Sequence, residues 1–580
     1  MSKANNDAEV LKKANSWLEG SYDEDTKSRI RAMIQNEQQE LIESFYRDLE
    51  FGTGGLRGIM GVGSNRMNKY TVGMATQGLA NYLKEQFSNL NKISVAVACD
   101  SRNNSQYFAR ITAEVFSAND IYVYLFEDLR PVPELSFAIR HFKCQSGVVI
   151  TASHNPKEYN GYKAYWDDGA QLISPHDKNV IAEVQKISNI DDVKFRGKPE
   201  NIHLIGADVD KEYLKAVKDL SLSPGIVHKH KDLKIVYTPL HGAGYKLIPM
   251  ALHKFGFENV SLVDKQDVPD GDFPTVKSPN PEEAAALEMA LDQAREINAD
   301  LVMATDPDGD RVGIAVKNNN GEFVLLNGNQ TASILTYYLL AKWKENKKLD
   351  GRQYIVKTIV TTELISDIAD KYAVDSFDVL TGFKFIADKI RAFEGKKEFI
   401  GGGEESYGYM IGDFVRDKDA VAACAMIAEA TAWTLDQGKS LYELLIDIYL
   451  EFGLYKERLF SVVKKGKVGA EEIQEMMENF RENPPENING SKVIMIKDYL
   501  KGISIDLVAG KESEIKLPKS NVLQFFTKDG TKISMRPSGT EPKIKFYFGV
   551  KGTLESREVY DDLNALLEKR IDAVIRDLDL

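Results

Sequence analysis

The chain has 580 residues, 43% of them hydrophobic, so it is long enough for several cored domains and too long for one. Its net charge of −13 argues against nucleic acid or an anionic membrane as a partner, although local Arg and Lys clusters can still bind phosphate. The N-terminus lacks a basic flank and an apolar core, and no apolar run approaches the ~18 residues of a membrane span. The three cysteines lack CxxC spacing, so we expect no disulfide framework. We therefore expect a cytoplasmic protein without a membrane span.

The first part of the chain shows helical periodicity and then an alternation of strands and helices. Residues 29–46 predict an N-terminal helical extension, which precedes a glycine-rich segment at 51–58. The elements expected next are a strand at 93–99, a helix at 105–118, a strand at 121–126, a helix at 133–142 and a strand at 147–150. This alternation predicts an α/β domain that places ligands at the carboxyl ends of its strands.

A serine loop follows the last of these strands. The segment T-A-S-H-N-P at residues 151–156 delivers Ser153 onto a polar loop, with the exposure that a nucleophile needs. A serine at the end of a strand is also a common turn former or helix cap. The loop alone does not decide between these interpretations.

A second α/β pattern begins at residues 233–237 and ends in an acidic loop. Asp306, Asp308 and Asp310 stand at alternate positions between two apolar runs, where three unneutralised carboxylates would repel one another. A hard divalent cation is their natural partner, and a shared phosphate favours Mg²⁺ over Ca²⁺. A calcium loop of the EF-hand type is excluded because Lys317 stands at its twelfth position; a solvated acidic turn is the alternative.

A third pattern runs from residues 354–360 to the glycines at 401–403. The segment G-E-E-S at 403–406 follows, with carboxylates suited to accepting hydrogen bonds from sugar hydroxyls. The glycines would let the backbone approach a ligand. A flexible glycine turn is the alternative.

The fourth part of the chain reads as an antiparallel sheet followed by a helix. The expected elements are strands at 521–526, 532–535 and 543–550, a turn at 528–530 and an amphipathic helix at 554–577. The fold class is therefore α/β, with three similar mixed α/β domains plus a C-terminal α+β domain. Interruptions in the pattern place the domains at residues 1–225 with the helical extension, 226–345, 346–454 and 455–580.

A phosphate loop lies within this last domain. The segment M-R-P-S-G-T-E-P-K at residues 535–543 crowds a guanidinium, two hydroxyls, an ammonium and a glycine into one short turn. The fork of Arg536 matches phosphate oxygens, and successive N–H groups in such a turn form an anion nest. A surface turn is the alternative.

Taken together and in this order, the four loops resemble those of the α-D-phosphohexomutase family. The resemblance extends from the glycine-rich segment at Gly52 to Tyr547, and four motifs in order are more specific than any one of them. It implies that each of four domains contributes one loop to a central cleft. It also implies Mg²⁺ as cofactor and sugar phosphates as ligands.

The resemblance assigns expected roles to individual residues. Ser153 is the phosphorylated serine and shares the metal with the aspartates. The phosphoryl group is surrounded by Arg57, Lys163 and Arg311. To these catalytic residues we add His154, which follows the serine directly. The metal ligands are Ser153, Asp306, Asp308 and Asp310. The sugar is bound by Gly382, Lys384, Glu404 and Ser406. The second phosphate is bound by Arg536, Ser538, Gly539, Thr540 and Lys543.

The reaction implied is the interconversion of α-glucose 1-phosphate and glucose 6-phosphate through glucose 1,6-bisphosphate. Mannose or pentose phosphates, or synthesis of a sugar bisphosphate, are the alternative substrates and products. Two further alternatives, a phosphatase and a non-catalytic sugar-phosphate sensor, would have the same binding site. Lys163, Lys384 and His154 stay open as the general base, and a monomer or homodimer is expected.

Overall fold

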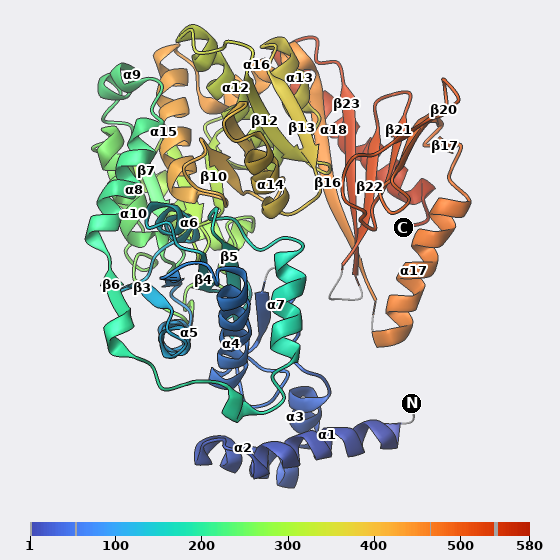
Figure 1. The fold of residues 1–580 in the computed structure, drawn as a ribbon. Helices are drawn as coiled ribbons and strands as arrows, with labels where there is room; N and C mark the ends of the chain where they lie inside the picture. The colour runs from blue at the N-terminus through green and yellow to red at the C-terminus, as the bar shows by residue number, and fades with distance from the viewer. Residues whose placement is uncertain (1–2, 53–54, 465, 539–542) are drawn as a thin grey trace.

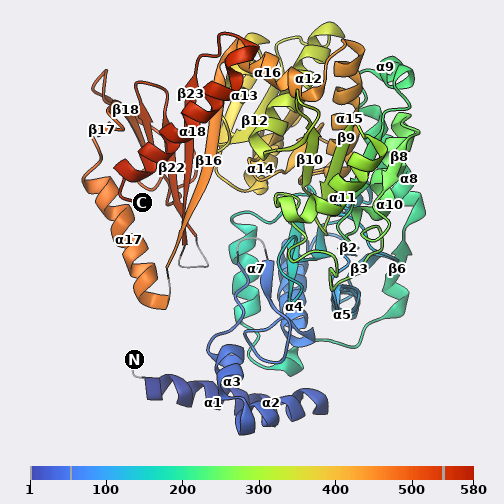
Figure 2. The same cartoon turned by 180° about the vertical axis from the view of Figure 1, so that it is seen from behind.

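The computed structural model describes residues 3–52, 55–464, 466–538 and 543–580. Within these residues the chain forms four blocks in sequence order, each built on its own sheet (Figure 1). The N-terminal helices lie at one end of the molecule, and the fourth block stands beside the other three (Figures 1 and 2). The predicted α/β fold class with a C-terminal α+β domain is confirmed.

The N-terminal extension consists of helices rather than one continuous helix. They are α1 (Lys3–Glu19), α2 (Glu24–Asn36) and α3 (Gln38–Phe45). The prediction of helix at 29–46 missed α1 and the break at Glu37, whose backbone leaves the helical region at φ −134° and ψ 56°. Trp17 and Phe45 pack in the same core cluster as Tyr70, so the extension is joined to the first block.

The first sheet carries the serine loop. Side by side, its strands are β1 (Gly55–Ile59), β5 (Tyr159–Trp166), β4 (Ser146–Ile150), β2 (Ser94–Cys99), β3 (Tyr122–Phe126) and β6 (Ile202–Ile205). Strands β4, β2, β3 and β6 are parallel, and β5 and β1 run antiparallel to their neighbours. Because the chain passes from β2 to β3 on one side and returns to β4 on the other, the serine loop lies at a topological switch point.

Helices and short 3₁₀ turns accompany this sheet and lead to the second block. The helices are α4 (Lys69–Gln86), α5 (Ser105–Ala118), α6 (Val132–His141), α7 (His176–Gln185), α8 (Ala207–Asp219) and α9 (Pro224–Lys229), and the 3₁₀ turns are η1 (Ile190–Asp192) and η2 (Pro199–Asn201). The expected helices at 105–118 and 133–142 correspond to α5 and α6. Their apolar faces pack on β2, β3 and β4.

The second sheet carries the acidic loop. Its strands, in spatial order, are β11 (Phe323–Leu326), β10 (Val312–Lys317), β9 (Leu301–Thr305), β7 (Ile235–Thr238) and β8 (Val260–Leu262), with helices α10 (Gly244–Phe255) and α11 (Ala284–Ile297). Strands β9, β7 and β8 are parallel, whereas β10 and β11 are antiparallel. The acidic loop joins β9 to β10, so it leaves the carboxyl end of a buried parallel strand.

The third sheet ends in the glycines of the G-E-E-S segment. Its strands are β13 (Asp375–Val379), β12 (Gln353–Thr358), β14 (Glu398–Gly403) and β15 (Tyr409–Ile411), and its helices are α12 (Gly328–Glu345), α13 (Leu364–Lys371), α14 (Phe383–Phe393), α15 (Ala420–Asp436) and α16 (Leu441–Phe452). A Cβ at Gly402 would lie 2.3 Å from the carbonyl oxygen of Val356, so the tight pairing of β14 with β12 requires glycine there.

The fourth sheet is antiparallel throughout. Its strands run in the order β16 (Leu454–Val463), β23 (Lys543–Gly552), β22 (Lys532–Pro537), β21 (Leu523–Thr527), β18 (Ser491–Asp498), β19 (Ile503–Asp506) and β20 (Lys511–Glu514), and β17 (Asn487–Ile488) pairs with β18. The helical elements of this block are α17 (Gly466–Glu482), η3 (Arg557–Val559) and α18 (Tyr560–Asp577). The helix expected from residue 554 therefore starts later as α-helix, after the 3₁₀ turn η3.

The predicted domain boundaries stay a proposal. Helix α12 ends at Glu345, just before the predicted boundary at 346, yet it packs on α13, α16 and β14 of the third block. Helix α15 of the third block packs on α10 and β9 of the second. One large core cluster therefore runs through the second, third and fourth blocks.

Candidate active site

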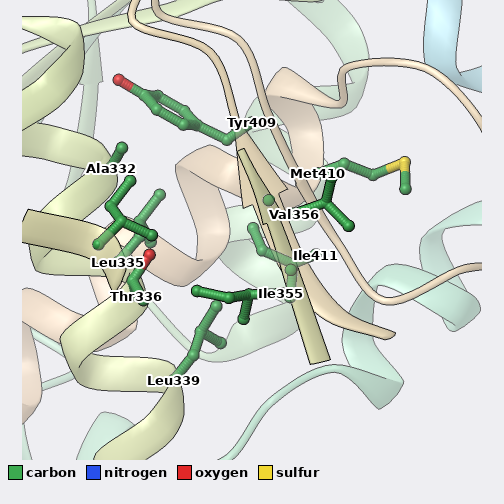
Figure 3. Close-up of a pocket in the computed structure, with 13 residues that line it drawn as sticks. Ala332, Leu335, Thr336, Leu339, Ile355, Val356, Tyr409, Met410 and Ile411 are labelled. Atoms are coloured by element: carbon green, nitrogen blue, oxygen red, sulfur yellow. The ribbon is translucent and has the colours of Figure 1, made fainter. Parts of the chain in front are cut away.

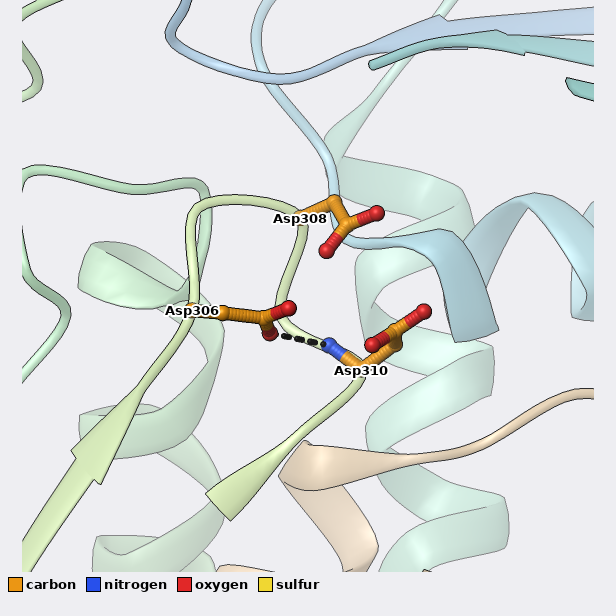
Figure 4. Close-up of side chains that lie close together, drawn as sticks. All are labelled: Asp306, Asp308 and Asp310. Atoms are coloured by element: carbon orange, nitrogen blue, oxygen red, sulfur yellow. Dashed lines mark hydrogen bonds between the residues drawn. The ribbon is translucent and has the colours of Figure 1, made fainter. Parts of the chain in front are cut away.

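The acidic loop brings its three carboxylates together in the interior of the protein. Asp306, Asp308 and Asp310 are at most 1% exposed, and one oxygen of each lies within 4.8 Å of the other two (Figure 4). Asp306 Oδ1 accepts hydrogen bonds from the backbone N–H groups of Asp310 at 3.1 Å and Arg311 at 3.0 Å. The loop thus folds back on its first aspartate and turns all three carboxylates toward one space.

Two buried lysines balance part of this negative charge. Lys163 Nζ lies 2.7 Å from Asp308 Oδ2, and Lys418 Nζ lies 3.0 Å from Asp310 Oδ2. Asp308 Oδ1 and Asp310 Oδ1 are buried and accept no hydrogen bond from any described residue. Burial and then repulsion from Asp308 and Asp310 raise the pKa of Asp306 well above its usual range. A hard divalent cation such as Mg²⁺ binds carboxylate oxygens, and here two oxygens of the three buried carboxylates are left without a hydrogen-bond partner by the described residues. The residues therefore fit the predicted metal.

The backbone of the acidic loop is held from several sides. The carbonyl oxygen of Asp308 accepts a hydrogen bond from Val132 N–H (2.9 Å). The carbonyl oxygen of Pro307 accepts one from Ala243 N–H (2.8 Å), and that of Gly309 accepts one from Ala420 N–H (3.3 Å). Gly309 has φ +63°, and a Cβ there would lie 2.7 Å from Pro131, so only glycine fits this turn without strain. The first, second and third blocks therefore fix the loop jointly.

Ser153 faces these carboxylates from the first block. Its side chain is almost fully buried, so the exposure expected from the sequence is wrong, because the loop packs against the acidic loop of the second block. Its Oγ donates to Asp306 Oδ2 at 2.9 Å and lies 3.2 Å from His154 Nδ1. The residue has φ +53°, a left-handed conformation that non-glycine residues rarely adopt and that functional loops often contain. Its N–H donates to Thr151 Oγ1 at 2.8 Å, which helps to hold this turn.

Arg102 supports the serine loop, and the sequence analysis missed it. The guanidinium is 3% exposed and donates to the carbonyl oxygens of Ser153 at 2.6 Å, Pro156 at 2.9 Å and Tyr159 at 3.0 Å, and also to that of Asn155. Arg102 follows the carboxyl end of β2, beside β4. Its position after a strand that neighbours the serine strand could have marked Arg102 as a candidate. Its hydrogen bonds to the serine loop could not be read from local sequence, because they join residues about fifty positions apart.

We predict that Arg102→Lys lowers kcat about 100-fold with little change in KM. A lysine ammonium cannot reach four carbonyl groups in a fixed fork, and misplacement of a reacting group by about 1 Å costs roughly 100-fold. Steady-state kinetics on the purified variant measure this split. Arg130→Lys is the matched control, because Arg130 is equally buried but holds Asp210, at 2.7 Å, rather than the serine loop. An Arg102→Lys enzyme with wild-type kcat would show that the loop holds itself.

The other residues expected around the phosphoryl group surround Ser153 and the acidic loop. Arg57 Nη1 donates to Asn155 Oδ1 at 3.2 Å, and Arg311 Nη1 lies 2.5 Å from Glu282 Oε1. Burial, reinforced by the positive charges of Arg311 and Arg57, lowers the pKa of His154 to about 2. His154 is therefore a neutral imidazole, whereas Lys163 stays cationic because Asp308 and Asp310 raise its pKa against the effect of burial.

The G-E-E-S segment contributes Glu404 and Glu405 to the wall of a cavity that His154 and Arg311 also line. Glu404 Oε1 accepts the N–H of Gly382 at 2.9 Å, so two of the residues expected to bind sugar are joined directly. Glu405 accepts hydrogen bonds from Thr358 and Thr361 at 3.2 and 3.3 Å, and burial followed by the charge of Glu404 raises its pKa to about 7.

Ser406 lines this cavity as well, but Lys384 is not among the described residues that do so. Its Nζ lies 5.3 Å from the centre of the Phe385 ring, at the start of α14.

The phosphate loop reaches the cleft from the fourth block. Arg536, Ser538 and Lys543 line a common cavity with Arg57 and His154. The expected phosphate ligands Gly539 and Thr540 lie outside the described residues. Lys545, which the sequence analysis did not single out, lines the same cavity because it stands two residues along β23 from Lys543.

The cleft has two adjoining parts that share His154, Arg536 and Lys545. The sugar lobe, about 630 Å³, is further lined by Glu282, Arg311, Gly382, Glu404, Glu405, Ser406 and Glu457, among others. The basic lobe, about 720 Å³, is further lined by Arg47, Arg57, Arg66, Asn155, Ser538 and Lys543, among others. Residues from all four blocks and the N-terminal extension therefore meet at one cleft.

A smaller cavity lies in the core of the third block, away from this cleft. It has about 20 Å³ and is enclosed by α12 and the strands β12, β14 and β15, with Leu335, Leu339, Ile355 and Ile411 in its wall (Figure 3). Such a volume holds about one water molecule, and an apolar wall offers it few hydrogen bonds. We interpret it as a packing gap rather than a ligand site.

Comparison with known proteins identifies the family. Models of phosphoglucomutase/phosphomannomutase alpha/beta/alpha domains I, II and III match residues 48–191, 211–321 and 327–452, which together make up more than half of the chain. The chain belongs to the phosphoglucomutase/phosphomannomutase family. It is accordingly an enzyme of the isomerase and phosphotransferase type, and the predicted resemblance to the α-D-phosphohexomutases is confirmed.

Curated relatives match over nearly the full length. A phosphoglucomutase of Staphylococcus haemolyticus is 38% identical over 509 residues, covering 88% of this chain and 91% of the relative. A phosphoglucomutase of Staphylococcus aureus strain MRSA252 is 36% identical over 554 residues, covering 95% and 98%. These matches include the fourth block, beyond the three family domains.

Solved structures share the fold. The open form of the Paramecium phosphoprotein pp63/parafusin, a phosphoglucomutase, has a TM-score of 0.69 at 19% identity and covers 92% of this chain and 95% of its own. A phosphoglucomutase/phosphomannomutase family protein of Burkholderia thailandensis has a TM-score of 0.64 at 16% identity, with 91% and 97% covered. In the part of the chain that the structure describes, no helix has the length and apolarity needed to span a bilayer.

Proposed function

We propose that the protein interconverts α-glucose 1-phosphate and glucose 6-phosphate, with Ser153 as the residue that carries the transferred phosphoryl group. The observation that carries this proposal is the hydrogen bond of 2.9 Å from Ser153 Oγ to Asp306, at the centre of the buried carboxylate cluster. The glucose preference is supported by relatives named phosphoglucomutase at 36–38% identity over most of the chain.

The proposed reaction has two transfers and consumes no net proton. In the first, the phosphorus–oxygen bond to Ser153 breaks, a sugar hydroxyl forms the new bond to phosphorus, and the proton of that hydroxyl ends on Ser153 Oγ. The sugar is then a bisphosphate. After it turns end over end, its other phosphoryl group returns to Ser153 by the reverse of the same step, and the isomeric monophosphate leaves.

The chain's own residues would hold the reacting groups in line, which is the main demand of phosphoryl transfer. Lys163 and Arg311 would spread positive charge around the phosphoryl oxygens, because both stay cationic beside the carboxylates. Phosphorylated Ser153, Asp306, Asp308 and Asp310 would hold Mg²⁺, which when bound neutralises phosphoryl oxygens as a Lewis acid. Arg536, Ser538 and Lys543 would hold the phosphate at the far end of the sugar.

Among the candidate bases, His154 is in contact with the serine, because its Nδ1 lies 3.2 Å from Ser153 Oγ. Its position favours it and its basicity does not, because a pKa lowered to about 2 makes the imidazole a weak proton acceptor. Lys163 is occupied in ion pairs with Asp308 and Asp310. The sugar hydroxyls would be bound in the sugar lobe by Gly382, Glu404 and Ser406.

We also propose that the protein is located in the cytoplasm.

A turnover assay with several sugars tests the proposed function. With Mg²⁺ and a trace of glucose 1,6-bisphosphate, the protein should convert α-glucose 1-phosphate to glucose 6-phosphate with a higher kcat/KM than mannose 1-phosphate or ribose 1-phosphate. Inorganic phosphate should be released in less than about one of a hundred turnovers, because a closed cleft excludes water from phosphoserine. Stoichiometric phosphate release would identify a phosphatase, and binding of sugar phosphates without turnover would identify a sensor.

A further inference from the structure

The N-terminal extension contributes to the wall of the catalytic cleft. Glu43 at the end of α3, Tyr46 and Arg47 line the basic lobe, although they precede residue 48, where the match to family domain I begins. Arg47 Nε donates to Asn65 Oδ1 at 3.2 Å, and the carbonyl of Arg47 accepts the hydroxyl of Ser64 at 2.9 Å. The arginine is therefore tethered at the rim of the lobe while its side chain stays exposed.

Several cations of the basic lobe take part in no ion pair between described residues: Arg47, Arg536, Lys543 and Lys545. Arg66 of the same lobe is paired, because its Nη2 lies 3.1 Å from Glu40 Oε1. Burial, and then repulsion from Lys543 and Arg536, lowers the pKa of Lys545. Cations that crowd together at such a cavity are matched by an anionic ligand.

The two lobes of the cleft differ in charge. Carboxylates line the sugar lobe at Glu282, Glu404, Glu405 and Glu457, whereas Glu43 is the acidic residue among the described lining of the basic lobe. Sugar hydroxyls suit the first environment and phosphate groups the second. Because the lobes share His154, Arg536 and Lys545, a ligand can pass between them without leaving the cleft.

We propose that the basic lobe is a holding site for the sugar bisphosphate and that Arg47 helps to retain this intermediate while it turns round. The inference rests on the proposed function and extends it to the step between the two transfers. During that step the bisphosphate must release Arg536, Ser538 and Lys543, the phosphate-loop residues that line the same lobe. Arg47 and Lys545 are cations of this lobe outside the phosphate loop, so they can keep one phosphate bound while the other moves, and fewer molecules escape before the second transfer.

Arg47→Gln is therefore expected to raise the escape of bisphosphate. The protein is loaded with a radiolabelled phosphoryl group on Ser153 and mixed with a large excess of unlabelled α-glucose 1-phosphate. Retention leaves the label in glucose 6-phosphate, whereas escape leaves it in free glucose 1,6-bisphosphate. The ratio of labelled bisphosphate to labelled glucose 6-phosphate should rise about tenfold in Arg47→Gln, the effect of losing one charge-assisted contact to phosphate. Arg47→Lys, which keeps the charge, should raise it less.

Arg31→Gln is the matched control, because Arg31 lies in the same extension, pairs with the exposed Glu24 and does not line the lobe. The ratio counts only molecules that turned over, so a partly unfolded preparation does not alter it. An Arg47→Gln ratio equal to those of the wild type and Arg31→Gln would overturn the inference and leave the proposed function intact. If the wild type transfers no label to glucose 1-phosphate, the proposed function is wrong and this inference falls with it.

Discussion

Ser153→Ala is expected to lower kcat for α-glucose 1-phosphate by at least about 10⁴-fold, because removal of a nucleophile removes the covalent route itself. The loss should not be repaired by higher substrate or bisphosphate concentrations. Alanine removes the hydroxyl that donates to Asp306 and leaves the surrounding loop clamped by Arg102. Coupled formation of glucose 6-phosphate, followed over hours at high enzyme concentration, measures the residual rate.

The same variant should also fail to incorporate phosphate from glucose 1,6-bisphosphate. Ser513→Ala, at an exposed position of β20, is the control and should keep both turnover and phosphate incorporation. Turnover by Ser153→Ala within tenfold of the wild type would show that another group carries the phosphoryl group.

Asp308→Asn should lower kcat by at least about 10³-fold, equivalent to about 4 kcal/mol of lost transition-state stabilisation. Asp308 is the carboxylate nearest to Lys163, at 2.7 Å, and one of its oxygens is orphaned. An amide keeps the shape but binds a hard cation weakly, since a negative ligand has become neutral.

A binding measurement separates metal binding from catalysis in this variant. Mg²⁺ at a hundred times its Kd should stabilise the wild type by about 2.7 kcal/mol against unfolding, and it should have a much smaller effect on Asp308→Asn at the same concentration. Asp292→Asn, an exposed carboxylate on α11 that pairs with Arg295, is the control and should respond to Mg²⁺ like the wild type. Equal stabilisation of Asp308→Asn would place the metal elsewhere.

The loops that carry chemistry could be predicted because they follow buried strands. The acidic loop joins β9 to β10 with the expected alternation, and Ser153 follows β4 at a switch point of the sheet. The spacing of residues along the chain identifies the functional residues within one loop, and apolar runs identify the strands that position that loop. The fold class followed from the same alternation.

The residues that support these loops could not be predicted in this way. Arg102 acts through carbonyl groups about fifty residues further along the chain, and Lys418 reaches Asp310 from the segment just before α15. Such contacts depend on how blocks pack, which no local period encodes. Strand β16 was missed because Lys456, Glu457 and Arg458 interrupt its apolar residues, so its sequence lacks the period-two alternation of apolar and polar residues that marks a typical strand.

The most direct test of the central claim is to locate the phosphate before and after one turnover. The protein is loaded from glucose 1,6-bisphosphate with isotopically labelled phosphoryl groups, freed of excess ligand and divided, and one half receives unlabelled α-glucose 1-phosphate. Peptide mass spectrometry should find the labelled phosphoryl group on Ser153 in the half without substrate. In the other half Ser153 should carry an unlabelled phosphoryl group, because the second transfer restores it, and the label should be found in glucose 6-phosphate and bisphosphate. A phosphoryl group on a different residue, or label that stays on Ser153 while substrate turns over, would contradict the account.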